Sequence, residues 1–107
     1  MKIQNMFPLV SVMDPDTEDF QSWANSNAHD LHGATVEAAH VMACTPGMDS
    51  VLVATFMWED EIYSDMSLQR KDIKDSLSHA INYYVENELY EFAAYAKSII
   101  DEISKND

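Results

Sequence analysis

Four side chains that bind metals or act as nucleophiles lie close together in the sequence: His29, His32, His40 and Cys44. His29 and His32, three residues apart, share one face of a helix and could supply two of the four ligands of a structural zinc ion. His40 and Cys44 complete the set only if the fold brings them there, and no CxxC or HExxH spacing supports such a site. We therefore interpret the histidine pair as surface residues near a helix end and predict no metal.

Cys44 and His40 also suggest a thiol nucleophile with an imidazole base. If this segment is a strand, the two residues lie about 13 Å apart at ~3.3 Å per residue, which is too far for proton transfer. We expect Cys44 to be a small core residue instead. As the only cysteine, it also excludes an intrachain disulfide, which favours a reducing cytoplasm.

Two groups of carboxylates, Asp14 with Asp16 and the run Glu59 to Glu61, could serve acid–base chemistry or bind magnesium. Acid–base catalysis requires one carboxyl group whose pKa is raised by burial, and nothing in these polar segments predicts burial. A glycine-rich phosphate loop is excluded because Gly33 and Gly47 are the only glycines. We expect no catalytic site and no cofactor. We therefore predict that the protein is not an enzyme.

The strongest compositional feature is charge. Nineteen acidic residues stand against six basic ones, for a net charge of -13. No lysine or arginine occurs between Lys2 and Arg70, a span that holds eleven of the acids. Such a field repels phosphate backbones and anionic lipids and attracts basic proteins. We expect no direct binding of nucleic acid or membrane surfaces; a role of the charge in solubility alone stays open.

The residues that we expect to bind a partner are exposed acids with an aromatic or methionine anchor beside them. They are Glu59, Asp60, Glu61, Tyr63, Asp65 and Met66, followed in second place by Asp14, Asp16, Glu18 and Asp19.

The first half of the chain predicts a strand within residues 2–13 and a helix over 15–32. Asp14 and Pro15 have the types preferred at the cap and first position of a helix, and Gly33 suits its end. Residues 35–44 are ambiguous between helix and strand. We interpret 35–58 as a hairpin whose second strand, the apolar run 50–58, lies in the middle of the sheet.

The second half predicts an acidic loop over 59–66 and then two helices, with Asn87 as the left-handed residue between them. The resulting order is β-α-β-β-α-α in a single domain, residues 1–107. We expect an α+β fold with a small antiparallel three-stranded sheet, one helix after the first strand and a C-terminal helical hairpin. No apolar run is as long as a membrane span.

The segment 77–103 resembles the UVR-type helical hairpin, a protein–protein interaction motif. The matching residues are Leu77, Ala80, Glu88 to Glu91, Ala93, Ala94, Ile100, Asp101 and Glu102. Lys97 and Ser98 depart from the arginine–aspartate pair of that family. The resemblance implies a binding role for the hairpin; a role only in covering the sheet is the alternative.

In size and charge the whole chain resembles small bacteriophage inhibitors of host defence or host enzymes, such as antirestriction and anti-CRISPR proteins. The resemblance implies an acidic inhibitor or modulator of a basic nucleic-acid-handling host protein, by partial DNA mimicry. The alternative is a structural or assembly protein that forms a homodimer through its C-terminal helices.

Overall fold

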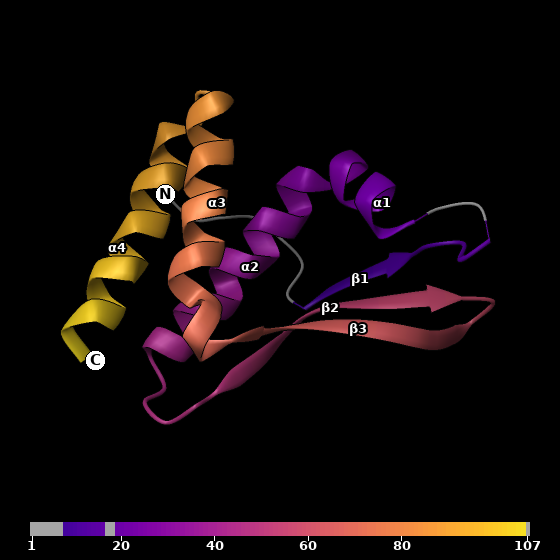
Figure 1. Ribbon diagram of the computed structural model, residues 1–107, viewed down its shortest axis with the longest axis horizontal. Helices are drawn as coiled ribbons and strands as arrows, with labels where there is room; N and C mark the ends of the chain where they lie inside the picture. Colours follow the sequence, from indigo (N-terminus) through magenta and orange to yellow (C-terminus); the bar gives the residue numbers. More distant parts are fainter. Residues whose placement is uncertain (1–7, 17–18, 107) are drawn as a thin grey trace.

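The computed structural model describes residues 8–16 and 19–106 (Figure 1). They form an α+β fold, with a three-stranded sheet, a helical segment on one of its faces and a helical hairpin at one end. The elements in chain order are β1 (Leu9–Val12), α1 (Phe20–Ser26), α2 (Ala28–Ala43), β2 (Ser50–Trp58), β3 (Glu61–Gln69), the 3-10 turn η1 (Arg70–Asp72), α3 (Ile73–Glu86) and α4 (Tyr90–Asn106).

The sheet has the strand order β1-β2-β3, with the predicted apolar run 50–58 as its central strand. β2 and β3 are antiparallel, as in a hairpin. β1 runs parallel to β2, with Leu9 beside Ala54 and Val12 beside Met57. The predicted all-antiparallel sheet is therefore wrong in one of its two pairings. Two helices carry the chain back to the end of the sheet where β1 begins, so β2 runs in the same direction as β1.

The ambiguous segment 35–44 belongs to helix α2 and not to a strand. One face of α2 is completely buried, with Val36, Ala39 and Met42 in the core beside the sheet. Gly33, predicted to end the first helix, lies buried inside α2. Small side chains let the helix pack closely on the sheet, and this tertiary contact decides the conformation of a segment whose local preferences are balanced.

The predicted helix start at Asp14 and Pro15 is also wrong. Helix α1 begins at Phe20, and its cap is Asp19, whose carboxylate accepts the backbone N–H of Ser22 at 2.7 Å. The Asp14 carboxylate instead accepts the N–H of Asp16 at 2.9 Å. An aspartate can cap a helix or a turn in the same way, so its type alone does not distinguish the two.

The predicted loop 59–66 is mostly strand. Only Glu59 and Asp60 form the connection, and β3 begins directly after them. In the later turn between α3 and α4, the left-handed residue is Glu88, with φ 58°, and not Asn87, with φ −101°. Gly47, predicted to supply a positive φ in the turn before β2, does so, with φ 89°.

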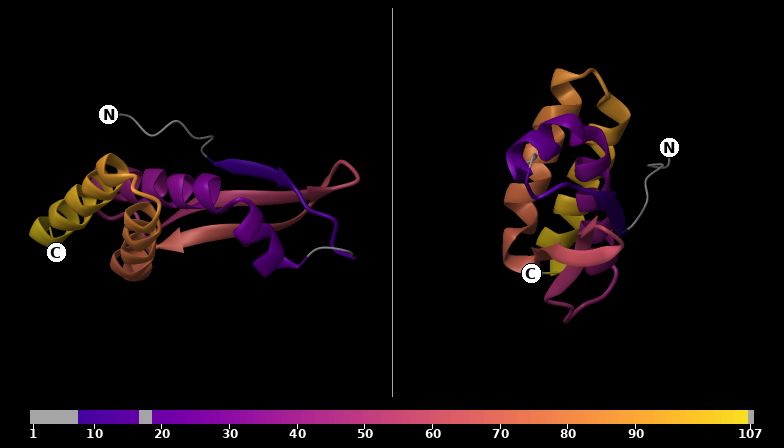
Figure 2. Two further views of the ribbon diagram at one scale, coloured as in Figure 1. Left: turned by 90° about the horizontal axis from the view of Figure 1, so that it is seen from above. Right: turned by 90° about the vertical axis from the view of Figure 1, so that its right-hand side faces the viewer.

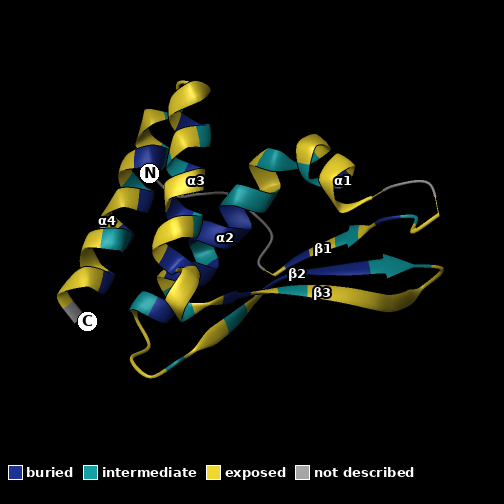
Figure 3. Ribbon diagram, in the orientation of Figure 1, coloured by how far each residue is buried: buried dark blue, intermediate teal, exposed yellow. Residues whose placement is uncertain are grey.

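The C-terminal helical hairpin is confirmed. Helices α3 and α4 lie side by side at one end of the molecule, and the β2–β3 hairpin reaches away from them (Figure 2). Ile73, Leu77 and Tyr84 on α3 and Ile103 on α4 are buried in one core with α2. The apolar stripes of both helices are thus largely covered within the chain (Figure 3).

Trp23 joins α1 to the sheet. Its ring is buried and meets Phe56 of β2 edge to face, with ring centroids 4.8 Å apart. Its indole N–H donates to the Ser11 hydroxyl of β1 at 2.7 Å. A single side chain therefore holds the first helix against both strands of the parallel pair.

We predict that Ser11→Ala destabilises the fold by about 1–3 kcal/mol, because it leaves the buried indole N–H without an acceptor. Trp23→Phe should lower the free energy of unfolding further, because packing is lost. In that background Ser11→Ala should change it little, because the indole N–H is already gone. Urea denaturation of both single variants and the double variant gives the coupling. Strictly additive free energies would contradict the bond.

Candidate functional site

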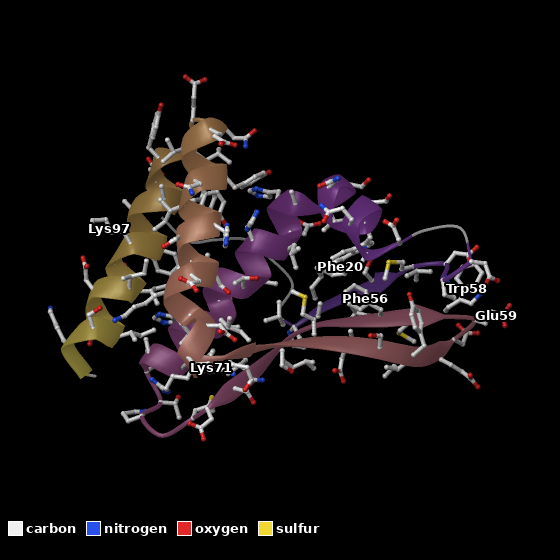
Figure 4. The ribbon with its side chains drawn as sticks, in the orientation of Figure 1. Phe20, Phe56, Trp58, Glu59, Lys71 and Lys97 are labelled. Carbon is white, nitrogen blue, oxygen red and sulfur yellow. The ribbon has the colours of Figure 1, made fainter. Side chains whose placement is uncertain are left out.

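The described basic residues all lie at the helical end of the molecule. The basic residues that the structure describes are Arg70, Lys71, Lys74, Lys97 and Lys105, which belong to η1, α3 and α4. Figure 4 shows Lys71 and Lys97 at the helical end and Glu59 at the opposite end of the sheet. Arg70 is engaged at the helical end, where its guanidinium donates to the carbonyls of Met42 and Met48, both at 2.8 Å.

The parallel pairing of β1 with β2 brings the two predicted acidic groups together. Val12 lies beside Met57, and the N–H of Met13 donates to the Met57 carbonyl at 3.1 Å. The chain thus leaves β1 next to the end of β2, with Asp14 close to the turn that begins after Trp58. We call Asp14, Asp16, Glu59, Asp60 and Glu61 the acidic tip; all five are exposed or partly exposed.

The turn at the acidic tip holds two acidic residues in an unfavourable backbone conformation. Trp58 pairs with Glu61, so Glu59 and Asp60 form a two-residue hairpin turn, with φ 53° and 64°. Such turns favour Asn-Gly, because a side chain at positive φ is strained. The backbone strain and the repulsion between the two neighbouring carboxylates thus both disfavour these residues in the turn.

An open hollow of about 250 Å³ lies beside the turn. It is lined by Val12, Met57, Trp58, Glu59 and Asp60, so that apolar surface meets a carboxylate rim. This combination fits a lysine or arginine side chain, whose aliphatic stem packs on apolar groups while its charge meets carboxylates or an aromatic ring.

A row of apolar side chains crosses the adjoining sheet face. Val12, Met57 and Ile62 are register neighbours on the three strands. Val12 and Ile62 expose 69% and 65% of their surface, more than any other large apolar residue among those described. Val12, Trp58 and Ile62 are site residues that were not predicted from the sequence. The one signal was a tryptophan directly before the run Glu59 to Glu61.

The other predicted partner-binding residues are divided. Asp65 and Tyr63 are exposed on β3, and the Tyr63 hydroxyl donates to the Met13 carbonyl at 2.9 Å, which fastens β3 to the end of β1. Met66 is half-buried and packs against the core, so it is not an exposed anchor. Asp19 caps α1, and its bonds with Ser22 lower the pKa of its carboxyl. Glu18 lies outside the described residues.

The histidines do not assemble a metal site. No group of three or more histidine, cysteine or acidic residues within 8–16 and 19–106 is placed to bind a metal. The exposed His29 and partly buried His32 pack against aromatic rings, with His32 and Tyr83 centroids 4.6 Å apart. Burial lowers the pKa of His32, and the nearby charges of His79 and His29 add to the effect.

Cys44 is exposed at the end of α2, and the prediction of a core residue is wrong. Because the segment is helical, Cys44 and His40 lie one turn apart, with Sγ and Nε2 at 3.7 Å. The separation expected for a strand does not apply. Tyr95 and Ser98 of α4 line a hollow beside them, and burial raises the pKa of the Tyr95 hydroxyl.

Comparison of the chain with protein-family models, with curated proteins and with solved structures finds no match. Among the residues that the structure describes, no helix combines the length and apolar character needed to cross a membrane.

We predict that replacing Glu59 and Asp60 with Asn-Gly stabilises the fold by about 1–2 kcal/mol, because both residues then tolerate positive φ. Urea denaturation measures the change. Glu59→Gln, which removes one charge without relieving the backbone, separates strain from repulsion. A double variant no more stable than the native chain would contradict the strained turn.

We predict that His32 lowers the stability of the fold as the pH falls below 6.5, the ordinary pKa of histidine. The folded pKa of His32 is lower, so the folded state binds fewer protons than the unfolded state in this range; the stabilisation is complete above pH 6.5 and is lost on acidification. His32→Gln should flatten the slope in urea denaturation between about pH 7.5 and about pH 5. An unchanged slope would exclude His32 as the cause.

Proposed function

We propose that the protein binds a basic protein through the acidic tip and inhibits or modulates that partner's handling of nucleic acid. The observation that carries the proposal is the register of β1 on β2, which joins Asp14 and Asp16 to Glu59, Asp60 and Glu61. One exposed surface then carries charge from two segments far apart in the sequence, at the end opposite the described bases.

The composition of this surface suits a protein partner. Apolar Val12 and Ile62 and the half-buried Trp58 lie among the carboxylates. Interfaces combine an apolar centre with a polar rim, and charges at the rim accelerate association and select the partner. Neighbouring exposed valine and isoleucine side chains add apolar contact area that solubility alone does not require.

Competition with nucleic acid follows from the shared chemistry of carboxylates and phosphates. B-DNA carries one charge per ~1.7 Å, so a duplex as long as the 21 Å short dimension of the molecule carries about 12 charges. The acidic tip with Asp19 and Asp65 supplies seven carboxylates. The proposed mimicry is therefore partial, and an inhibitor of the bacteriophage type would add apolar contacts to it.

We predict that Glu59→Lys with Glu61→Lys slows association with the partner about tenfold at low salt and flattens its salt dependence. The matched control is Asp101→Lys with Glu102→Lys, which changes net charge equally on exposed positions of α4. The partner is first captured from bacterial lysate at low salt. Duplex DNA added to the complex should then displace the protein from its partner. Equal losses in both variants would contradict a localised site.

The alternative function, self-assembly through α3 and α4, is favoured by Val85 and Tyr90, which expose 47% and 60% of their surface near the turn between the helices. The stripes of both helices are otherwise largely covered within the chain. We expect sedimentation velocity to give a monomer at all concentrations; a dimer lost on Tyr90→Asp would favour the alternative.

A further inference from the structure

The outer edge of β3 is long and open. β3 is the last strand in the order β1-β2-β3, and its nine residues Glu61–Gln69 pair with β2 on one side only. Within residues 8–16 and 19–106, no strand lies on its other side. Seven of the nine residues, all except Met66 and Leu68, are exposed. An unpaired edge presents backbone N–H and C=O groups that can accept another strand.

The opposite edge of the sheet is protected, which makes the contrast informative. β1 has only four residues, and Pro8, which has no N–H to donate, directly precedes it. Proteins usually protect edge strands by shortness, proline, lysine or bulges. β3 has neither proline nor lysine. Its one bulged residue is Tyr63, between the pairs of Phe56 with Ser64 and Met57 with Ile62, so a bulge protects only one end of the edge and leaves residues 64–69 open.

The side chains along the open edge differ in kind. Ile62 continues the exposed apolar row of Val12 and Met57. Asp65 pairs with Thr55 of β2, so the two side chains lie on the same face of the sheet. Asp65 carries a negative charge at the middle of β3. An added strand would therefore meet an apolar side chain near the acidic tip and a carboxylate further along.

A second copy of the chain fits this edge poorly. Asp65 is the central residue of β3, so a symmetric antiparallel pairing of two copies places Asp65 opposite Asp65. Like charges directly opposite each other destabilise a strand pair. The net charge of -13 on each copy adds long-range repulsion. The same charges favour a basic strand.

We propose that β3 accepts an extended segment of the basic partner as a fourth strand, with a lysine or arginine beside Asp65 and an apolar residue beside Ile62. This inference rests on the proposed function, since the partner is the protein that the acidic tip attracts. Backbone pairing gives the contact its geometry, and Asp65 and Ile62 select the side chains.

A blocked, fluorescent peptide as long as β3 tests the pairing. On one face it carries lysine at its central position and valine on either side, so that in either strand direction the lysine can lie beside Asp65 and a valine beside Ile62. Two further peptides carry N-methyl groups on alternate residues. One lacks the N–H donors along one edge of the peptide strand, and the other lacks those along the opposite edge. Fluorescence anisotropy at low salt should show binding of the parent peptide, about tenfold weaker binding of one N-methylated peptide and little change for the other. Amide hydrogen exchange should slow along β3 in the complex.

The matched variants are Asp65→Lys and Asp101→Lys, which change the net charge of the chain equally. Asp65→Lys should weaken peptide binding about tenfold and Asp101→Lys much less, because only Asp65 lies on β3. Failure of the parent peptide to bind, or equal binding of both N-methylated peptides, would overturn the fourth strand.

These outcomes are distinguishable from failure of the proposed function. A captured basic partner that depends on Glu59 and Glu61, together with no effect of N-methylation, would keep the acidic tip as a binding surface and overturn only the strand addition. If no basic partner depends on the acidic tip, the proposed function itself is wrong and the inference fails with it.

Discussion

The parallel pairing of β1 with β2 is the interaction on which the rest of the structure depends. It requires the chain to cross back before β2 begins, and α1 and α2 make that crossing. It also sets which residues share an end of the sheet. Had β1 been antiparallel to β2, Asp14 would lie near the start of β2, about 26 Å from Glu59 at ~3.3 Å per residue. The parallel register instead builds the acidic tip from both segments.

The two ends of the molecule contribute unequally to stability. At the helical end, α2, α3 and α4 bury the larger part of the apolar surface, and Arg70 ties the turn before β2 to the helices through three backbone carbonyls. At the other end, Glu59 and Asp60 occupy a strained turn and apolar side chains stay exposed. The core compensates for a tip that is unfavourable for folding, and the proposed binding of a basic partner would give that tip its use.

Local pattern predicted much of the fold. The apolar run 50–58 and the stripes of α3 and α4 have the period and length of their elements, and each was placed correctly. The segment 35–44 was not, because its alanines and valines suit either a helix or a strand and only packing against the sheet decides. The direction of β1 has no local signature at all, since it depends on that same decision.

The candidate site was predicted in its composition but not in its assembly. The acids were named from charge, yet their meeting point depends on a long-range register. The turn at Glu59 and Asp60 lacks the Asn-Gly pair that marks such a hairpin, so the sequence predicts a loop over 59–66, where the first part of β3 lies. Val12, Trp58 and Ile62 have the types of core residues, but in the fold Val12 and Ile62 are exposed on the two outer strands and Trp58 is half-buried at the end of β2.

Nuclear Overhauser contacts between β1 and β2 would establish the direction of β1. In the isotope-labelled protein, we expect contacts of the Val12 methyl groups with Met57, and of the Met13 amide with the end of β2. Those contacts place Asp14 beside the turn at Glu59 and confirm one acidic surface made of two segments. Contacts of Val12 with Val51 or Leu52 would show an antiparallel β1. The two acidic groups would then lie apart, and the acidic tip would not be one surface.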